Sequence, residues 1–318
     1  MKKTQDHLML LSLLTAGLLA GCSADDSTER GTTSQDAVRL EGTNDWQAVN
    51  GTRAATIYDD ATPLTSFRTY AYVDDTDTEY ISDALVEQGV DSSWGFVGGD
   101  YFWPKLNNLN FFAYAPSDLD KSLVSKGDIS YSPASGPSFS VALPASSAGQ
   151  EGKSEFIYAY ETNKNKANDA VGVKLAFHHP FATLSFKLSK AHPGVTINSI
   201  KLKDVLTTGT FTHGSTPQWA SLDGKQDFLA TIGGEFGSGT FPQEIGGPYV
   251  VLPQNFAGGK QTIEVSYTDH GSEEVMVAEV NIPKWESGYQ YAYTLTLDSY
   301  LTVTSLTIDI NPWKKYEW

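Results

Sequence analysis

The sequence predicts an all-β protein built from two tandem antiparallel β-sandwich domains. Short runs of β-type residues, separated by clusters of Gly, Pro, Asn and Asp, recur along most of the 318-residue chain. Several runs alternate strictly: in 261–268, Ile263, Val265 and Tyr267 share one face and polar residues occupy the other. The pattern lacks the amphipathic helices that a parallel sheet requires. These observations favour antiparallel sheets packed face to face.

The expected strands follow in order from the stalk to the C-terminus. They are 66–73, 109–115, 155–160, 173–177, 182–188, 196–202, 249–252, 261–268, 275–282, 289–297 and 301–310. One short helix is expected, at 81–88. A polar loop at 164–169 precedes a fresh set of strands and places the domain boundary near residue 175. Residues 54–175 and 176–318 are therefore the two predicted sandwiches.

Residues 1–22 have the pattern of a lipoprotein signal. Met1-Lys2-Lys3 precede an apolar run at 8–20, which as a helix is about 20 Å long and too short for a hydrocarbon core of about 30 Å. Two small residues then precede Cys22, the single cysteine of the chain, whose thiol can accept a diacylglycerol. Two or more acyl chains hold a protein stably at a membrane, so we expect a lipid anchor. An ordinary secretory signal with a chance cysteine is the alternative.

Residues 23–53 are expected to form a flexible polar stalk or a pro-segment. They are rich in Thr, Ser, Gly, Asp and Gln, with only scattered apolar residues, and such a composition does not offset the entropy cost of ordering. The formal net charge of −16 argues against nucleic acid and anionic lipid surfaces as partners, because those require clustered Lys and Arg. A single cysteine also excludes a disulfide within the chain.

The motifs that carry chemistry give no support for an enzyme, a cofactor or a metal site. His178 and His179 are adjacent, so in a strand their side chains point to opposite faces and cannot readily share a metal. The acidic run at 74–79 lacks the glycine and the glutamate of a calcium loop. The glycine-rich stretch at 234–239 neither follows a clear parallel strand nor opens a helix. A carboxylate pair set by the fold would escape a sequence motif.

Two aromatic clusters, at 101–104 and 111–114, admit two interpretations. They can form a platform on which sugar rings stack, or they can fill sandwich cores. The alternation of apolar side chains across 111–115 favours a strand that is buried on both faces. Solvent exposure of Phe102, Trp103 and Trp219 would favour a glycan-binding surface lipoprotein, and burial would favour a structural protein.

Short motifs also occur in a characteristic order: 101–104 (YFWP), 109–116 (LNFFAYAP), 156–159 (FIYA), 175–186 (LAFHHPFATLSF), Trp285, Gly288, Tyr289, Tyr291, 293–295 (YTL) and 308–313. With the lipoprotein signal, this order resembles the fimbrillin, or Mfa-like fimbrial, proteins of Bacteroidales, whose members build or anchor type V pili. The resemblance implies transthyretin-like sandwiches, a fimbrial or surface location, a role in adhesion and other fimbrial subunits as partners.

The same resemblance bears on export and processing. Asp25 and Asp26 are similar to the acidic tag that sends some lipoproteins of such bacteria to the outer face of the outer membrane, although a solvated linker is the alternative. The family implies that a trypsin-like protease removes an N-terminal segment at an arginine. The best candidate bond is Arg53-Ala54, at an expected exposed loop, with Arg30 and Arg39 as further candidates. A surface arginine without processing is the alternative.

The family also implies assembly by strand exchange. Removal of a paired strand leaves unpaired backbone groups and an apolar groove, which is a template for another chain. The candidate donor is the C-terminal stretch; four or five of its apolar side chains at about 1.5–3 kcal/mol each give about 6–15 kcal/mol before ordering costs. Its apolar residues are Leu301, Val303, Leu306, Ile308 and Ile310.

Two questions about this stretch stay open from the sequence. Its apolar phase slips between Val303 and Leu306, which predicts a bulge or a move between sheets. If the strand instead completes its own sandwich, the protein suits a tip or an anchor better than a stalk. The adhesion target, a glycan or a protein on a host or bacterial surface, is not identified by the sequence.

Overall fold

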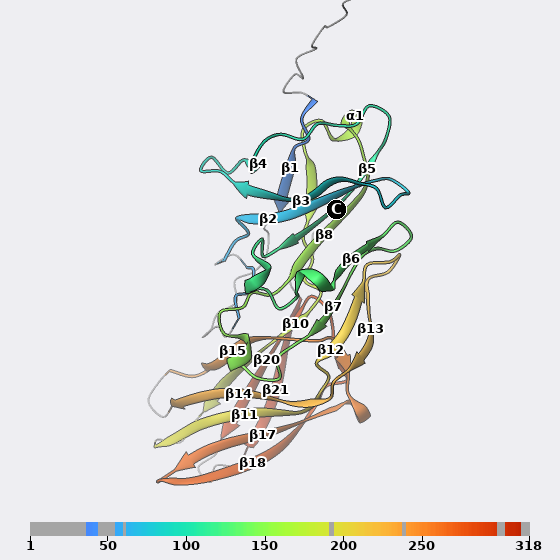
Figure 1. The fold of residues 1–318 in the computed structure, drawn as a ribbon. Helices are drawn as coiled ribbons and strands as arrows, with labels where there is room; N and C mark the ends of the chain where they lie inside the picture. Colours follow the sequence, from blue (N-terminus) through green and yellow to red (C-terminus); the bar gives the residue numbers. More distant parts are fainter. Residues whose placement is uncertain are drawn as a thin grey trace, which may run out of the picture.

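The computed structural model describes residues 36–43, 55–59, 62–190, 194–236, 240–297 and 303–312. This part of the chain is nearly all β, as predicted, with one four-residue α-helix, α1 (Lys166–Asp169). Figure 1 shows an elongated molecule with the first strands at one end, a sandwich of later strands at the other, and β6, β7, β12 and β13 between them. The short 3-10 turns in its loops are Leu119–Lys121, Lys126–Asp128, Ala148–Gln150 and Ala257–Gly259.

The N-terminal core lies between a five-stranded sheet and a two-stranded sheet. The larger sheet is antiparallel, in the order β4 (Trp94–Phe96), β3 (Glu79–Gln88), β2 (Ser66–Val73), β5 (Leu109–Ala115) and β8 (Ile157–Lys164). The smaller sheet pairs β1 (Leu40–Thr43) in parallel with β9 (Val173–Ala176). Phe67, Phe111 and Leu175 are buried in the core that these sheets form.

The prediction of a stalk throughout 23–53 was wrong for residues 36–43. These residues are ordered, and Ala37, Val38 and Leu40 are only 1%, 2% and 3% exposed. The scattered apolar residues of the segment find partners in strands far away in sequence, which composition alone does not reveal. The rest of 23–53 lies outside the described residues.

The prediction of a helix at 81–88 was also wrong, because this segment is strand β3. Ile81, Ala84 and Val86 are buried, and the pairing with β2 shifts register between Thr69↔Ala84 and Ala71↔Ile81. Asp83 lies at this shift with a φ of 46°, as expected of a β-bulge that inserts one extra residue. The bulge turns the period-2 pattern into the i, i+3 spacing typical of a helix.

The C-terminal sandwich has two four-stranded sheets. One has the order β15 (Gln243–Val251), β10 (Ala182–Lys190), β20 (Tyr289–Leu297) and β21 (Val303–Pro312), and the other has the order β14 (Gln226–Glu235), β11 (Val195–Val205), β17 (Lys260–Asp269) and β18 (Ser272–Asn281). Their shared core contains Phe186, Trp285 and Tyr293. The Trp285 indole donates a hydrogen bond of 2.9 Å to the Tyr293 hydroxyl, so two large side chains satisfy each other inside the core.

Pairing in the C-terminal sandwich departs from the antiparallel expectation at one place. β10 and β20 run parallel, because the strands of the opposite sheet form the long connection that a parallel pair requires. A short antiparallel pair, β16 (Gln254–Asn255) with β19 (Lys284–Trp285), closes one end.

A further sheet joins strands from both sides of the boundary predicted near residue 175. Its order is β13 (Gln218–Asp223), β12 (Thr208–Thr212), β7 (Gly136–Ala142) and β6 (Ile129–Ser132), and β7 pairs with β12. Phe139 and Phe211 share a core with Phe112 and Tyr158 of the five-stranded sheet. β5 is buried along its whole length, as the 111–115 alternation predicts. The two-domain division stays a prediction, and its halves share this core.

Candidate functional site

The N-terminal segment 36–43 is fastened to the N-terminal core along its whole length. Lys166 of α1 forms an ion pair with Asp36, and the backbone carbonyl of Asp36 accepts a hydrogen bond of 3.0 Å from Trp103 N. Val38 N donates to Tyr101 O at 2.8 Å, and Arg39 O accepts from Val173 N at 2.9 Å. The ladder with β9 continues these contacts through Thr43. We call the surroundings of residues 36–43 the β1 site.

Side chains of the segment alternate between the core and solvent. Val38 and Leu40 are buried, Arg39 between them is exposed, and Glu41 is half-buried. Gly42 lies on the inward side below the Trp94 ring, where an added Cβ would be 3.0 Å from Trp94 Cζ2. The β1 site therefore holds an extended strand whose inward positions 38 and 40 carry apolar side chains and whose inward position 42 is a glycine, without a side chain.

The candidate processing residues fall in different surroundings. Arg53, Ala54 and Arg30 lie outside the described residues, as does Cys22. Arg39 is exposed, but its carbonyl is hydrogen-bonded and its neighbours on both sides are buried. A protease needs an extended and accessible backbone, so the fold protects the Arg39–Leu40 bond.

Residues 55–59, which follow the Arg53-Ala54 bond, form a largely buried segment. Ala55 and Ile57 are 1% and 0% exposed. Thr56 N donates to Lys153 O at 2.7 Å, and Thr56 O accepts from Glu155 N at 2.9 Å. A chain that begins at Ala54 would keep these contacts, since none of them involves residues upstream of the bond.

The candidate donor strand lies at the edge of its own sheet. β21 pairs antiparallel with β20 from Tyr289↔Pro312 to Leu297↔Val303. The register shifts where Ser305 and Val303 face Thr296 and Leu297, so the predicted bulge is confirmed. Leu306 and Ile308 are half-buried against the C-terminal core, whereas Ile310 is 51% exposed. Leu301 lies outside the described residues.

The aromatic residues that would distinguish a glycan-binding protein are buried or half-buried. Trp103 is 8% exposed, and its ring centroid lies 6.0 Å from that of Phe111. Trp219 is half-buried, and its indole donates to Pro180 O at 2.7 Å while its ring packs against Phe139 and Phe211. Phe102 is half-buried beside Ala37. Burial of Trp103 therefore favours the structural interpretation, whereas Phe102 and Trp219 each keep part of their surface exposed.

The two histidines are separated as the sequence predicts. His178 pairs through its backbone with Tyr158, whereas the buried His179 ring lies 3.0 Å from the Glu155 carboxylate. Glu155 is fully buried and also accepts a hydrogen bond of 2.7 Å from Tyr58 N. Burial and the nearby Glu155 carboxylate raise the pKa of the Tyr58 hydroxyl. This polar group ties the segment after Ala54 to the start of the C-terminal half.

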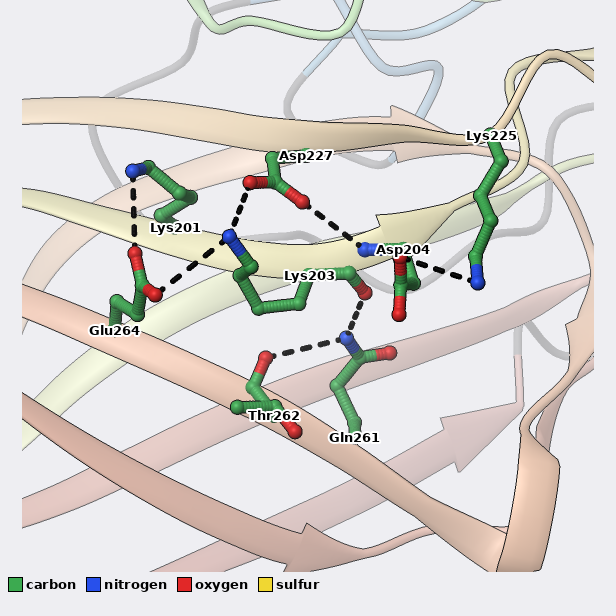
Figure 2. A network of polar contacts seen from close by, with 8 residues as sticks. All are labelled: Lys201, Lys203, Asp204, Lys225, Asp227, Gln261, Thr262 and Glu264. Carbon is green, nitrogen blue, oxygen red and sulfur yellow. Dashed lines mark hydrogen bonds and ion pairs between the residues drawn. The ribbon is translucent and has the colours of Figure 1, made fainter.

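Figure 2 shows a network of charges on the face of the β14-β11-β17-β18 sheet that points away from the core. Lys203 Nζ contacts Asp227 Oδ2 at 2.5 Å and Glu264 Oε1 at 3.6 Å, and Lys201 Nζ contacts Glu264 at 3.1 Å. The hydrogen bond from Lys203 lowers the pKa of Asp227. Because lysines and carboxylates pair with one another, the network is a solvated, self-neutralising surface and offers no concentrated charge to a ligand.

Two further findings concern metal sites and membrane-spanning helices in the described residues. Within those ranges, no three His, Cys, Asp or Glu side chains gather closely enough to hold a metal ion. No helix in the same part of the chain has the length and apolar character needed to cross a membrane.

The comparisons with known proteins agree with this architecture. The family model for fimbrillin-like proteins matches residues 52–313. The chain belongs to the fimbrillin-like family. The matched region begins beside Arg53, so β1 lies just upstream of it.

Solved structures show the same fold at low sequence identity. A fimbrial protein from Bacteroides vulgatus has a TM-score of 0.56 and 14% identity, covering 83% of this chain and 100% of that one. A candidate cell adhesion protein from Bacteroides uniformis has a TM-score of 0.56 and 15% identity, covering 88% and 100%. One from Bacteroides ovatus has a TM-score of 0.54 and 16% identity, covering 88% and 99%. A comparison with curated proteins finds no match.

Proposed function

We propose that this fimbrillin-like protein is a lipid-anchored subunit of a fimbrium on the outer membrane, that it assembles by exchange of β-strands and that it serves adhesion. One observation carries the proposal: strand β1, upstream of the candidate Arg53-Ala54 bond, fills a place in the N-terminal core. Similar folds occur in a fimbrial protein and in candidate cell adhesion proteins, which supports the fimbrial role. Acylation of Cys22 would hold the unprocessed chain at the membrane.

Cleavage at Arg53 would weaken the hold on β1 without removing any of its contacts. Burial of Val38 and Leu40 is worth about 3–6 kcal/mol in total before ordering costs. While the chain is continuous, that gain opposes only the closure of a short loop. After cleavage it opposes the cost of associating two separate chains, about 4–15 kcal/mol. A longer donated strand that buries more side chains would then displace the segment.

The donor in this proposal is a C-terminal strand that leaves its own sheet. Among the residues that the structure describes, β21 occupies a sheet edge and is paired on one side only, with β20, so its removal would break a single described ladder. A chain whose β21 stays on β20 would accept a strand but donate none, and that chain would suit a tip or an anchor.

Mass spectrometry of the protein from native membranes and from sheared fimbriae tests the proposal. We expect acylated Cys22 at the N-terminus of the membrane form and Ala54 at the N-terminus of the assembled form. Arg53→Ala should keep residues 22–53 attached and prevent assembly. Arg39→Ala is the matched control, because that bond is protected, and should assemble normally. Assembled material that retains residues 36–43 would show that β1 is not replaced.

A further inference from the structure

We propose that Gly42 and Trp94 make the β1 site selective for its occupant. The site accepts an extended strand that is apolar at two alternate positions and glycine at the third, and this strand comes from a chain of different sequence rather than from a second copy. The identity of the replacing strand rests on the proposed function, whereas the selectivity of the site rests on contacts within the intact chain.

The selective element is a pair of rings at the end of β1. The centroids of Phe67 and Trp94 lie 5.1 Å apart. A Cβ built on Gly42 would lie 3.0 Å from Trp94 Cζ2 and 3.3 Å from both Phe67 Cε1 and Trp94 Cε2. Phe67 is fully buried and has little room to move, and Trp94 belongs to β4, which pairs with β3. A branched side chain at this position must therefore push one of two packed rings aside.

The chain's own C-terminal strand does not match this requirement. If Leu306 and Ile308 take the places of Val38 and Leu40, Ile310 falls at the place of Gly42. If the strand slides by two residues in either direction, Ile308 or Pro312 falls at the place of Gly42. If the strand runs the opposite way, Leu306 or Thr304 falls at that place. One register, with Leu301 and Val303 inward, brings Ser305 to this place, and even serine carries the Cβ that meets the rings at 3.0 Å.

Hydrogen exchange of the full-length chain tests the Gly42–Trp94 contact without any proteolysis. Gly42→Ile should speed exchange of the peptide that contains residues 36–43 by at least about tenfold, because overpacking against fixed rings opens the strand. In a Trp94→Ala background, the same substitution should change exchange by less than about threefold, because the contact at 3.0 Å is gone and the side chain can turn away from Phe67 into the space that Trp94 leaves. Arg39→Ile, on the exposed face of the segment, is the matched control and should leave exchange close to the original rate. Equal effects of Gly42→Ile in both backgrounds would overturn the selectivity.

Capture of labelled peptides by the chain cleaved at Arg53 tests the origin of the occupant. A peptide of residues 36–43 should bind only weakly, because burial of Val38 and Leu40 barely offsets the cost of association, so it is supplied in large excess. The same peptide with Gly42→Ile and a peptide of residues 303–312 should both bind at least about tenfold more weakly still. Equal binding of the 303–312 peptide would identify a second copy as the occupant and overturn the proposal. A cleaved chain that never releases residues 36–43 would contradict strand exchange itself, whereas the exchange rates of the intact chain would still decide the role of Trp94.

Discussion

Leu40→Ala is the sharpest probe of whether the N-terminal segment is part of the fold. Leu40 is 3% exposed in the N-terminal core, and a Leu→Ala change in such a place costs about 2–5 kcal/mol. The cost falls mainly on the closed state of β1, since the opened segment exposes Leu40 to water. At a factor of ten for each 1.4 kcal/mol, the lower end of this range raises the opened population about thirtyfold.

Hydrogen exchange followed by mass spectrometry measures that population directly. Exchange should accelerate by about thirtyfold or more in peptides from β1 and β9, because Val173 N donates to Arg39 O. Exchange in β20, which belongs to the C-terminal sandwich, should not change. Arg39→Ala should alter the rates by no more than about twofold, as expected for an exposed residue. Unchanged exchange at β1 in Leu40→Ala would refute the reasoning that core burial holds this segment.

Three further predictions concern the shared core, acid stability and the surface network. Phe139→Ala should lower the free energy of unfolding by about 3–5 kcal/mol, and denaturant unfolding should show one shifted transition rather than a shift in one of two steps, because β7 pairs with β12. Burial lowers the pKa of His213 from its ordinary value of 6.5. As the pH falls, the unfolded state therefore binds a proton before the folded state does, and the free energy of unfolding should fall below pH 6.5. Between pH 7 and pH 5, the melting temperature of His213→Gln should fall less than that of the original chain. Lys203 holds the pKa of Asp227 below its ordinary value of 3.8, and this interaction stabilises the fold above that pH. Lys203→Met should therefore lose less stability than the original chain when the pH is lowered to 2. Urea midpoints that fall equally in both proteins would contradict this.

Where burial follows the local pattern, the sequence predicted strands accurately. β2, β5 and β20 begin and end at the expected residues. β5 is apolar at consecutive positions because both of its faces are covered. The later part of β20 alternates because only one of its faces points into the C-terminal core. Strong patterns of this kind are set by the residues themselves.

The strands that the sequence missed have weak local patterns, and some of them depend on partners distant in the chain. β6 and β12 are short and mostly Ser, Thr and Gly, and each gains its ladder from β7. β7 in turn contributes Phe139 to a core with residues of the C-terminal half. In β3, the bulge at Asp83 gave buried residues a helical spacing. Long-range pairing outweighed local preference at β12, which is far from β7 in the sequence. β6 and β3 pair with neighbouring strands of the chain, and their sequences lack a clear period-2 pattern.

Some parts of the candidate site could be predicted from the sequence, and others could not. Cys22 and Arg53 could be predicted from the sequence, since the lipid transferase and the protease expected to act on them would each read a short peptide. β1 is not recognisable in this way, because Val38 and Leu40 stand alone in a polar segment. Gly42 also gave no sequence signal, since its significance comes from a Trp94 ring that another strand carries.

The sequence by itself determined that the chain is all-β and that its strand motifs follow the fimbrillin order, and it predicts an export and acylation signal at residues 1–22. These properties reside in residue type and local spacing, which survive in an extended chain. Only the tertiary structure decided that the segment before Arg53 belongs to the N-terminal core, and that two rings limit what can take its place. Those properties arise from contacts between residues far apart in sequence, and such contacts exist only once the sheets have packed.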